Sequence, residues 1–242
     1  MATTQGHLLG GRVVYRQPVS GFRSGIEPIL LAASIPARAG EHVLEAGTGA
    51  GAALLCLTAR VPGVHATGVE MDAAMADLAA ANAETNGFSS IGIVCDRIES
   101  AVLPRLFDHA IANPPYHRPS DPASPDAGRA SAKRGSNVLI RSWIERLSMS
   151  LRRHGSLTFI VSAGMVPACV TAMSGSCCPC TAIFPFWPKV ERSAKLVLLR
   201  GVRDSHTPMR LLSGMVLHRP DGSFSDAAQA ILGNAAALAI DG

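Results

Sequence analysis

The sequence predicts an α/β fold in which a mostly parallel, doubly wound sheet carries helices on both faces. Short apolar runs typical of buried strands alternate with helical patterns from residue 42 to about residue 172. A glycine-rich segment follows the first strand, and a short turn with proline separates the last two. Repeated strand–helix–strand units form parallel sheets, whereas strands joined by a short turn pair antiparallel. We therefore expect seven strands, with an antiparallel hairpin at the sheet edge.

The composition is that of a globular protein. Apolar residues make up 48% of the 242-residue chain, charged residues make up 17%, and the formal net charge is +4. Disordered chains combine low hydrophobicity with high net charge, so that class is excluded. A chain of this length can bury a large core without a disulfide or metal staple. We expect a single domain over residues 1–242, and the mild positive charge permits an anionic partner.

The cysteines and the N-terminus predict a cytoplasmic protein with reduced thiols. The six cysteines have no framework spacing, the first residues do not resemble a signal peptide, and no apolar run approaches the roughly 18 residues of a spanning helix. We therefore expect no membrane contact. The segment Cys177–Cys180 contains one C-x-x-C, but a structural zinc site needs a second half, so free thiols are favoured and no metal is expected.

The predicted strands are short runs of buried character bounded by turn residues. They cover residues 42–47, 65–71, 91–96, 107–112, 156–162, 181–186 and 194–201. A helix over 50–60 follows the first strand. A second helix follows the next strand, with Asp72 as its N-cap and Gly87 as the left-handed residue beyond its end.

A third helix is predicted to begin at Ser136 or Asn137. Its apolar residues recur at helical spacing, the basic residues at 152–154 suit a last turn, and Gly155 marks the end. The preceding residues 117–135 are rich in Pro, Ser, Ala and Arg, and we interpret them as a mobile substrate loop.

The glycine-rich segment at 43–51 leaves a strand and opens a helix. Gly47, Gly49 and Gly51 allow a sharp turn and a close approach of the backbone to a ligand. Glu70 ends the next strand, where a carboxylate can accept hydrogen bonds from both ribose hydroxyls. The same glycine pattern also fits dinucleotides.

A second carboxylate, Glu45, favours S-adenosylmethionine over a dinucleotide. Two acidic side chains suit a ligand with an ammonium group and a ribose, but they crowd a pyrophosphate. Asp96, at the end of the third strand, is within reach of an adenine amino group or is a solvated loop residue. With Met71 and Arg97, these residues form the predicted cofactor site.

The segment Asn113-Pro114-Pro115-Tyr116 follows the fourth strand, which in a doubly wound sheet lies beside the first. Two prolines make the backbone rigid and hold Asn113 extended. The Asn113 side-chain oxygen and the Pro114 carbonyl then form two acceptors for a planar amino group. Tyr116 offers a face on which a base can stack.

These motifs resemble the class I methyltransferases that act on amino groups, and their adenine-N6 branch in particular. The likeness to the bacterial tRNA1(Val) adenine-37 N6-methyltransferase group covers roughly residues 10–235, including the segments 17–33 and 217–225. It implies a Rossmann-like class I methyltransferase fold and S-adenosylmethionine as cofactor. It also implies that Asn113 and Pro114 hold the amino group and that Tyr116 stacks on the base.

The resemblance assigns residues 1–41 as a segment that covers the cofactor, with Phe22 and Arg23 as contacts. Phe22 stands where the group has Tyr, and Glu27 where it has Asp. Asn113 belongs to the cofactor contacts as well as to the catalytic set.

The function indicated is transfer of a methyl group to adenine N6 in RNA, with tRNA favoured. Methylation of a protein glutamine amide, or of adenine in rRNA or DNA, are the alternatives within enzymes. An RNA-binding protein with a vestigial cofactor pocket is the alternative outside them, and a nicotinamide oxidoreductase leaves the Asn113 loop unexplained.

Basic residues after the Asn113 loop support the RNA interpretation. They concentrate between residues 117 and 153, where arginine guanidinium groups suit phosphate. The predicted RNA contacts are Arg118, Arg129, Lys133 and Arg134.

Overall fold

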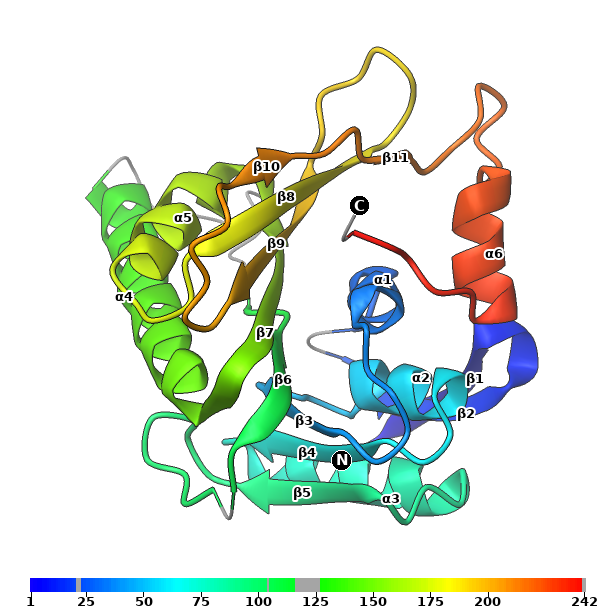
Figure 1. The fold of residues 1–242 in the computed structure, drawn as a ribbon. Coiled ribbons are helices and arrows are strands. Elements are labelled where there is room, and N and C mark those ends of the chain that lie inside the picture. Colours follow the sequence, from blue (N-terminus) through cyan, green and yellow to red (C-terminus); the bar gives the residue numbers. More distant parts are fainter. Residues whose placement is uncertain (21–22, 104, 116–126, 241–242) are drawn as a thin grey trace.

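The computed structural model describes residues 1–20, 23–103, 105–115 and 127–240, with side chains described outside 127–136 (Figure 1). Within this part of the chain, a central sheet of nine strands has the order β10-β8-β9-β7-β6-β3-β4-β5, with β11 also paired to β8. The seven predicted strands are β3 (His42–Ala46), β4 (His65–Glu70), β5 (Ile91–Cys95), β6 (Phe107–Ala112), β7 (Leu151–Ser162), β8 (Cys180–Trp187) and β9 (Leu196–Val202).

The pairing of these strands confirms the predicted fold class. Strands β5, β4, β3, β6 and β7 are all parallel, whereas β9 lies antiparallel between β7 and β8. Two short strands that the sequence did not indicate, β10 (Arg210–Leu211) and β11 (Met215–Val216), add to β8 in parallel.

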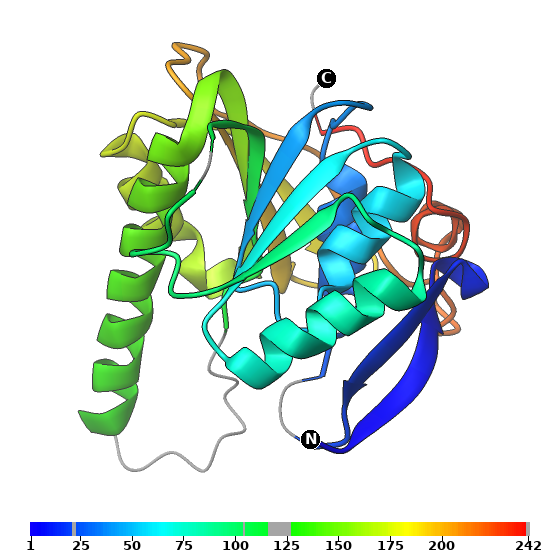
Figure 2. The ribbon, with the colours of Figure 1, turned by 90° about the horizontal axis from the view of Figure 1, so that it is seen from below.

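Helices cover both faces of the sheet, as Figures 1 and 2 show. On one face, α1 (Glu27–Ser34), α2 (Ala52–Arg60) and α3 (Ala73–Thr85) pack over a core that α6 (Asp226–Asn234) also joins. On the other face, α4 (Ala127–Ser150) and α5 (Val166–Ser174) pack over a second core. Helices α1, α5 and α6 were not predicted. In the described part of the chain, no helix is long and apolar enough to cross a membrane.

The predicted ends of α3 are confirmed. The Asp72 carboxylate accepts hydrogen bonds from the backbone N–H groups of Ala74 and Met75 at 2.9 and 3.2 Å. Gly87 has φ +69°, the left-handed conformation expected just beyond a helix.

The predicted bounds of α4 are wrong at both ends. The helix begins at Ala127, so 127–135 are not loop, and it stops at Ser150 because Leu151 is buried in β7 opposite Phe107. The basic residues at 152–154 therefore lie in a strand. Gly155 does not end a helix; a Cβ there would lie 2.8 Å from the carbonyl oxygen of Asp108, so close strand packing requires glycine.

An N-terminal hairpin of β1 (Thr3–Leu8) and β2 (Val13–Pro18), joined by the short helix η1 (Leu9–Gly11), packs beside α3. Asn82 on α3 and Asn86 at its C-cap form hydrogen bonds to β2 like those of a neighbouring strand. Asn82 Oδ1 accepts from the Arg16 N–H and its Nδ2 donates to the Arg16 carbonyl, while Asn86 pairs with Val14 in the same way. Asn82 Nδ2 also donates to the Ala50 carbonyl at 2.9 Å, so one buried amide joins the hairpin to the glycine loop.

We predict that Asn82→Ala lowers the free energy of unfolding by about 2–3 kcal/mol, because it leaves buried backbone groups without partners. Asn82 is 1% exposed. Thr85→Ala, at an exposed position on the same helix, is the control. Chemical denaturation of both variants measures the difference, and equal stabilities would contradict the bridging role.

Candidate active site

The site lies where the strand order reverses. Strand β3 is paired on one side with β4 and on the other with β6, so the glycine loop after β3 is next to the Asn113 loop after β6. Ligands of doubly wound sheets bind at this point, beyond the carboxyl ends of the strands. The placement predicted for the fourth strand is confirmed.

The glycine loop adopts backbone angles that side chains disfavour. Gly47, Gly49 and Gly51 have φ of +66°, +56° and +88°. The N–H groups of Gly47 and Thr48 both donate to the Val69 carbonyl, at 2.8 and 3.2 Å, which ties the loop to β4. Glycine therefore serves the turn itself as well as any approach of a ligand.

Trp143 on α4 presses against this loop. A Cβ added at Gly47 would lie 2.6 Å from the indole ring, so only glycine fits. We did not predict a role for Trp143 from the sequence, although it stands four residues after Leu139 and four before Leu147 in an apolar helical stripe. That spacing indicates a buried helix face without indicating which loop it meets.

A cavity of about 340 Å³ is lined by the glycine loop and by Glu70, and we call it the Glu70 cavity. The Glu70 carboxylate accepts from the backbone N–H groups of Gly49 and Asp72 at 2.9 and 3.0 Å, so its position is fixed at the end of β4. The predicted site residues that line this cavity are Gly47, Gly49, Glu70, Met71, Asp96, Arg97, Asn113 and Pro115. Ile98, Leu139 and Trp143 add apolar walls.

A second, smaller cavity of about 40 Å³ also borders the glycine loop, and we call it the Glu45 cavity. Glu45, Thr48 and Asn113 line it, together with Tyr15 and Ser24 from the N-terminal segment. The Tyr15 hydroxyl and the Ser24 hydroxyl are 2.8 Å apart. Gly47, Gly49, Met75 and Asn113 line both cavities, so the two adjoin at the Asn113 loop.

Glu45 differs electrostatically from the sequence-based expectation. It is 3% exposed, and burial raises the pKa of its carboxyl to about 8, although the Thr48 hydroxyl donates to it at 2.6 Å. At neutral pH this carboxyl is mostly protonated. The contact of Glu45 with an ammonium group stays a prediction.

Some predicted residues line neither cavity. The described residues that line the two cavities do not include Arg23, Gly51 or Pro114. Gly51 is the N-cap of α2, and Pro114 is buried beside Asn113. Outside the described residues are Phe22, Tyr116 and Arg118, and the side chains of Arg129, Lys133 and Arg134.

The Cys177–Cys180 segment leads into β8, whose first residue is Cys180, and does not line either cavity. Burial raises the pKa of Cys178 to about 12 and that of Cys180 to about 11. These thiols therefore stay protonated and unreactive at neutral pH. All six cysteines are free.

Comparison with known proteins shows the family. The family model of the methyltransferase small domain matches residues 27–163. A tRNA1(Val) (adenine(37)-N6)-methyltransferase of Porphyromonas gingivalis is 33% identical over 57% of this chain and 58% of its own length. One of the same name from a Flavobacteriaceae bacterium is 28% identical over 58% of this chain and 59% of its own. The matched region thus spans less than two thirds of these relatives.

Solved structures show the same fold. A predicted O-methyltransferase of Agrobacterium tumefaciens superposes with a TM-score of 0.75 at 21% identity, over 89% of this chain and 100% of that one. A 16S rRNA N2 methyltransferase of Thermus thermophilus, solved with AdoMet and guanosine, gives 0.55 at 18% identity, over 84% and 50%. Fold and family together imply S-adenosylmethionine as methyl donor. Since the family model covers more than half of the sequence, this chain belongs to the methyltransferase small domain family.

Proposed function

We propose that this methyltransferase modifies the exocyclic N6 amino group of adenine in RNA, with tRNA as its substrate and the cytoplasm as its location. The observation that carries the proposal is the position of Asn113, whose loop lines both the Glu70 cavity and the Glu45 cavity. Both curated relatives named above are tRNA adenine-N6 methyltransferases, which supports this substrate over a protein amide or DNA. Free thiols suit the reducing cytoplasm.

The residues present fit S-adenosylmethionine. Glu70 ends its strand as a rigid pair of acceptors suited to ribose hydroxyls, and Ile98, Leu139 and Trp143 offer apolar walls for a planar base. Asp96 lines the same cavity, where it can accept from the adenine amino group. We assign the amino-acid end to the adjoining Glu45 cavity, which Tyr15 and Ser24 also line. When bound, the cofactor supplies an electrophilic methyl group.

The chain's own task is to hold and activate the target amino group. The lone pair of an adenine amino nitrogen is delocalised into the ring, so the nitrogen is a weak nucleophile. We assign the Asn113 side-chain oxygen and the Pro114 carbonyl as acceptors of its two N–H bonds, which draws the nitrogen toward tetrahedral geometry. Two consecutive prolines keep both acceptors rigid, so positioning and electrostatics supply the catalysis. The target base leaves its stack at a cost of about a few kcal/mol.

The first test is Asn113→Ala. We expect methyl transfer to tRNA to fall at least about 100-fold, because one of two preorganised acceptors is lost, while affinity for S-adenosylmethionine falls far less. Radiolabelled methyl transfer and calorimetry measure the two quantities. Asn234→Ala, an exposed asparagine at the end of α6, is the control. Unchanged turnover in Asn113→Ala would falsify its role.

The second test separates the Trp143 contact from backbone strain. Gly47 and Gly87 have nearly equal φ, +66° and +69°, but a Cβ meets the indole only at Gly47 and finds nothing within 4 Å at Gly87. We expect Gly47→Ala to lose about 2 kcal/mol more stability than Gly87→Ala, and about tenfold in cofactor affinity. Calorimetry and thermal unfolding check both. Recovery of stability in the double variant with Trp143→Leu would identify the clash as the cause, and equal losses in the two alanine variants would rule it out.

The third test concerns pH. The folded protein raises the pKa of Glu45 from 4.5 to about 8, so the folded state binds more protons between these values and the contribution of Glu45 to stability is lost as pH rises through 8. Glu45→Gln stays neutral throughout. We therefore expect its Tm, relative to wild type, to increase on the order of 5 °C between about pH 5 and about pH 8. Glu84→Gln, at an exposed site on α3, is the control, and a pH-independent difference for Glu45→Gln would refute the buried neutral carboxyl.

A further inference from the structure

The connection between β8 and β9 lies at the same edge of the sheet as the active site. Strand β9 is antiparallel to β7, and β8 is antiparallel to β9, so β8 runs in the direction of β7 and β6. The end of β8 therefore points toward the edge at which Asn113 follows β6. Figure 1 shows residues 188–195, in yellow, as a loop that extends beyond the ends of both strands. We call residues 188–195 the β8–β9 turn.

The register of the strands places this turn beside the active site and outside the sheet edge. Ala112, the last residue of β6, is opposite Phe159, which is in turn opposite Leu199. Lys195 lies four residues further toward this edge, which is about 13 Å beyond the end of β6. Strand β7 lies between β6 and β9, so the lateral offset is about 10 Å. An RNA strand with its target base beside Asn113 therefore passes within reach of the turn.

A later segment of the chain supports the turn at its base. The Lys189 ammonium group donates to the Pro220 carbonyl at 2.9 Å. The backbone N–H of His218 donates to the Pro188 carbonyl at 3.1 Å. These partners belong to the segment 217–225, which lies outside the residues that the family model matches. The segment thus holds the turn at its base, while the residues at the tip stay exposed.

The turn carries an excess of positive charge. Three cationic residues, Lys189, Arg192 and Lys195, stand against one acid, Glu191, so the net charge is +2. Arg192 and Lys195 are both exposed. Among the described residues, no acidic side chain forms an ion pair with either of them. No ion pair has to break before these two side chains bind an anion, and the fork of donors on arginine suits phosphate.

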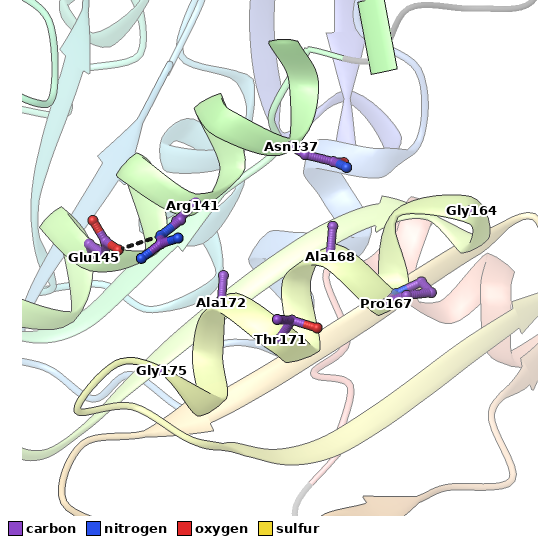
Figure 3. Close-up of a pocket in the computed structure, with 9 residues that line it drawn as sticks. All are labelled: Asn137, Arg141, Glu145, Gly164, Pro167, Ala168, Thr171, Ala172 and Gly175. Carbon is purple, nitrogen blue, oxygen red and sulfur yellow. Dashed lines mark hydrogen bonds and ion pairs between the residues drawn. The ribbon is translucent and has the colours of Figure 1, made fainter. Parts of the chain in front are cut away.

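A hollow of about 690 Å³ between α4 and α5 offers less to a polyanion (Figure 3). Among the described residues that line it, the charged side chains are Arg141 and Glu145, which pair with each other at 2.8 Å. Figure 3 shows this pair on α4, with Ala168 and Ala172 of α5 on the other wall. The lining therefore has no net charge, whereas the exposed cations of the β8–β9 turn lack acidic partners.

The character of the turn favours a nucleic acid over a protein as its partner. Protein interfaces bury an apolar core. The structure describes the whole turn, and Val190 is its one large apolar side chain that is strongly exposed. A phosphate backbone needs no such core, because the release of counterions supplies much of the affinity.

We propose that the β8–β9 turn binds the phosphate backbone of the substrate RNA beside the target adenine, through Arg192 and Lys195. This inference rests on the proposed function, since it names a surface that holds the same RNA. Phosphate contacts orient a nucleic acid without reading its sequence. The turn thereby contributes affinity, while the Asn113 loop selects the base.

The first test is charge reversal with a matched control. Arg38 is exposed, has no acidic partner among the described residues, and precedes β3, so it lies at the opposite edge of the sheet. Arg192→Glu and Arg38→Glu change the net charge equally. With an unmodified tRNA1(Val) transcript, we expect Arg192→Glu to raise KM and the Kd for RNA about tenfold, with kcat and S-adenosylmethionine affinity unchanged. Arg38→Glu should stay close to wild type.

The second test asks whether the contacts are to phosphate. Each lost phosphate contact makes the dependence of log Kd on log salt less steep. We expect the double variant Arg192→Ala/Lys195→Ala to reduce this slope by about 1.5, measured by fluorescence anisotropy. The control is Arg38→Ala/Arg105→Ala, which removes two exposed cations at the opposite edge. Equal Kd values in the two Glu variants, or equal slopes in the two double variants, would overturn the turn as an RNA contact.

A third variant makes a prediction of opposite sign. Glu191→Gln removes the one acid of the turn, so RNA binding should tighten about twofold. Glu84→Gln, exposed near the end of α3, is the control and should leave RNA binding unchanged. A turn with a merely structural role gives no such gain, and its absence would count against the contact.

The two proposals fail separately. If wild type binds the transcript but transfers no methyl group to adenine, the proposed function is wrong, and the turn is still judged by the binding of the paired variants. If wild type methylates the transcript and the paired variants do not differ, the function stands and the turn is not the RNA contact. If wild type does not bind RNA, both are wrong.

Discussion

The indole of Trp143 rests against the glycine loop with no space for a side chain at Gly47. This contact joins the loop after β3 to helix α4. It requires glycine at the turn, sets the depth at which α4 packs, and thereby places Leu139 as a wall of the Glu70 cavity. Because interiors are close-packed, a change at either partner is transmitted to the other. The cavity is thus shaped by residues nearly a hundred positions apart in the chain.

The other side of the site depends on hydrogen bonds rather than on packing. Asn82 and Asn86 complete the backbone pairing of β2, and Asn82 also reaches Ala50 beside the glycine loop. The hairpin in turn carries Tyr15, whose hydroxyl meets Ser24 over the Glu45 cavity. Neutral amides suit this role because they satisfy both a donor and an acceptor of the strand without introducing a buried charge.

The parts predicted best from the sequence are those with one dominant local signal. Four of the parallel strands, the cap at Asp72 and the glycine loop were placed within one or two residues, since periodicity and turn chemistry act locally. Strand β7 begins at Leu151, well before its predicted start at residue 156. Helices α1 and α5 were missed, and both carry proline in their first turn, where it is tolerated although it usually suggests a break. The end of α4 depends on Leu151 meeting Phe107, and the roles of Trp143 and Tyr15 depend on partners far away in sequence. Such contacts leave no local pattern.

The position of β9 has a consequence for how the polypeptide matures on the ribosome. Strand β8 is synthesised before β9, yet it is held to the sheet through β9. Until residue 202 has emerged, β7 therefore presents an unpaired edge, and the apolar strand β8 has no partner in the sheet. Arg200, 1% exposed on β9, then donates to the carbonyl of Ser34, the last residue of α1, and so joins this late strand to an early helix. Nascent chains that stop short of this strand expose unpaired strand edges, so the sheet of this enzyme is completed late in its synthesis.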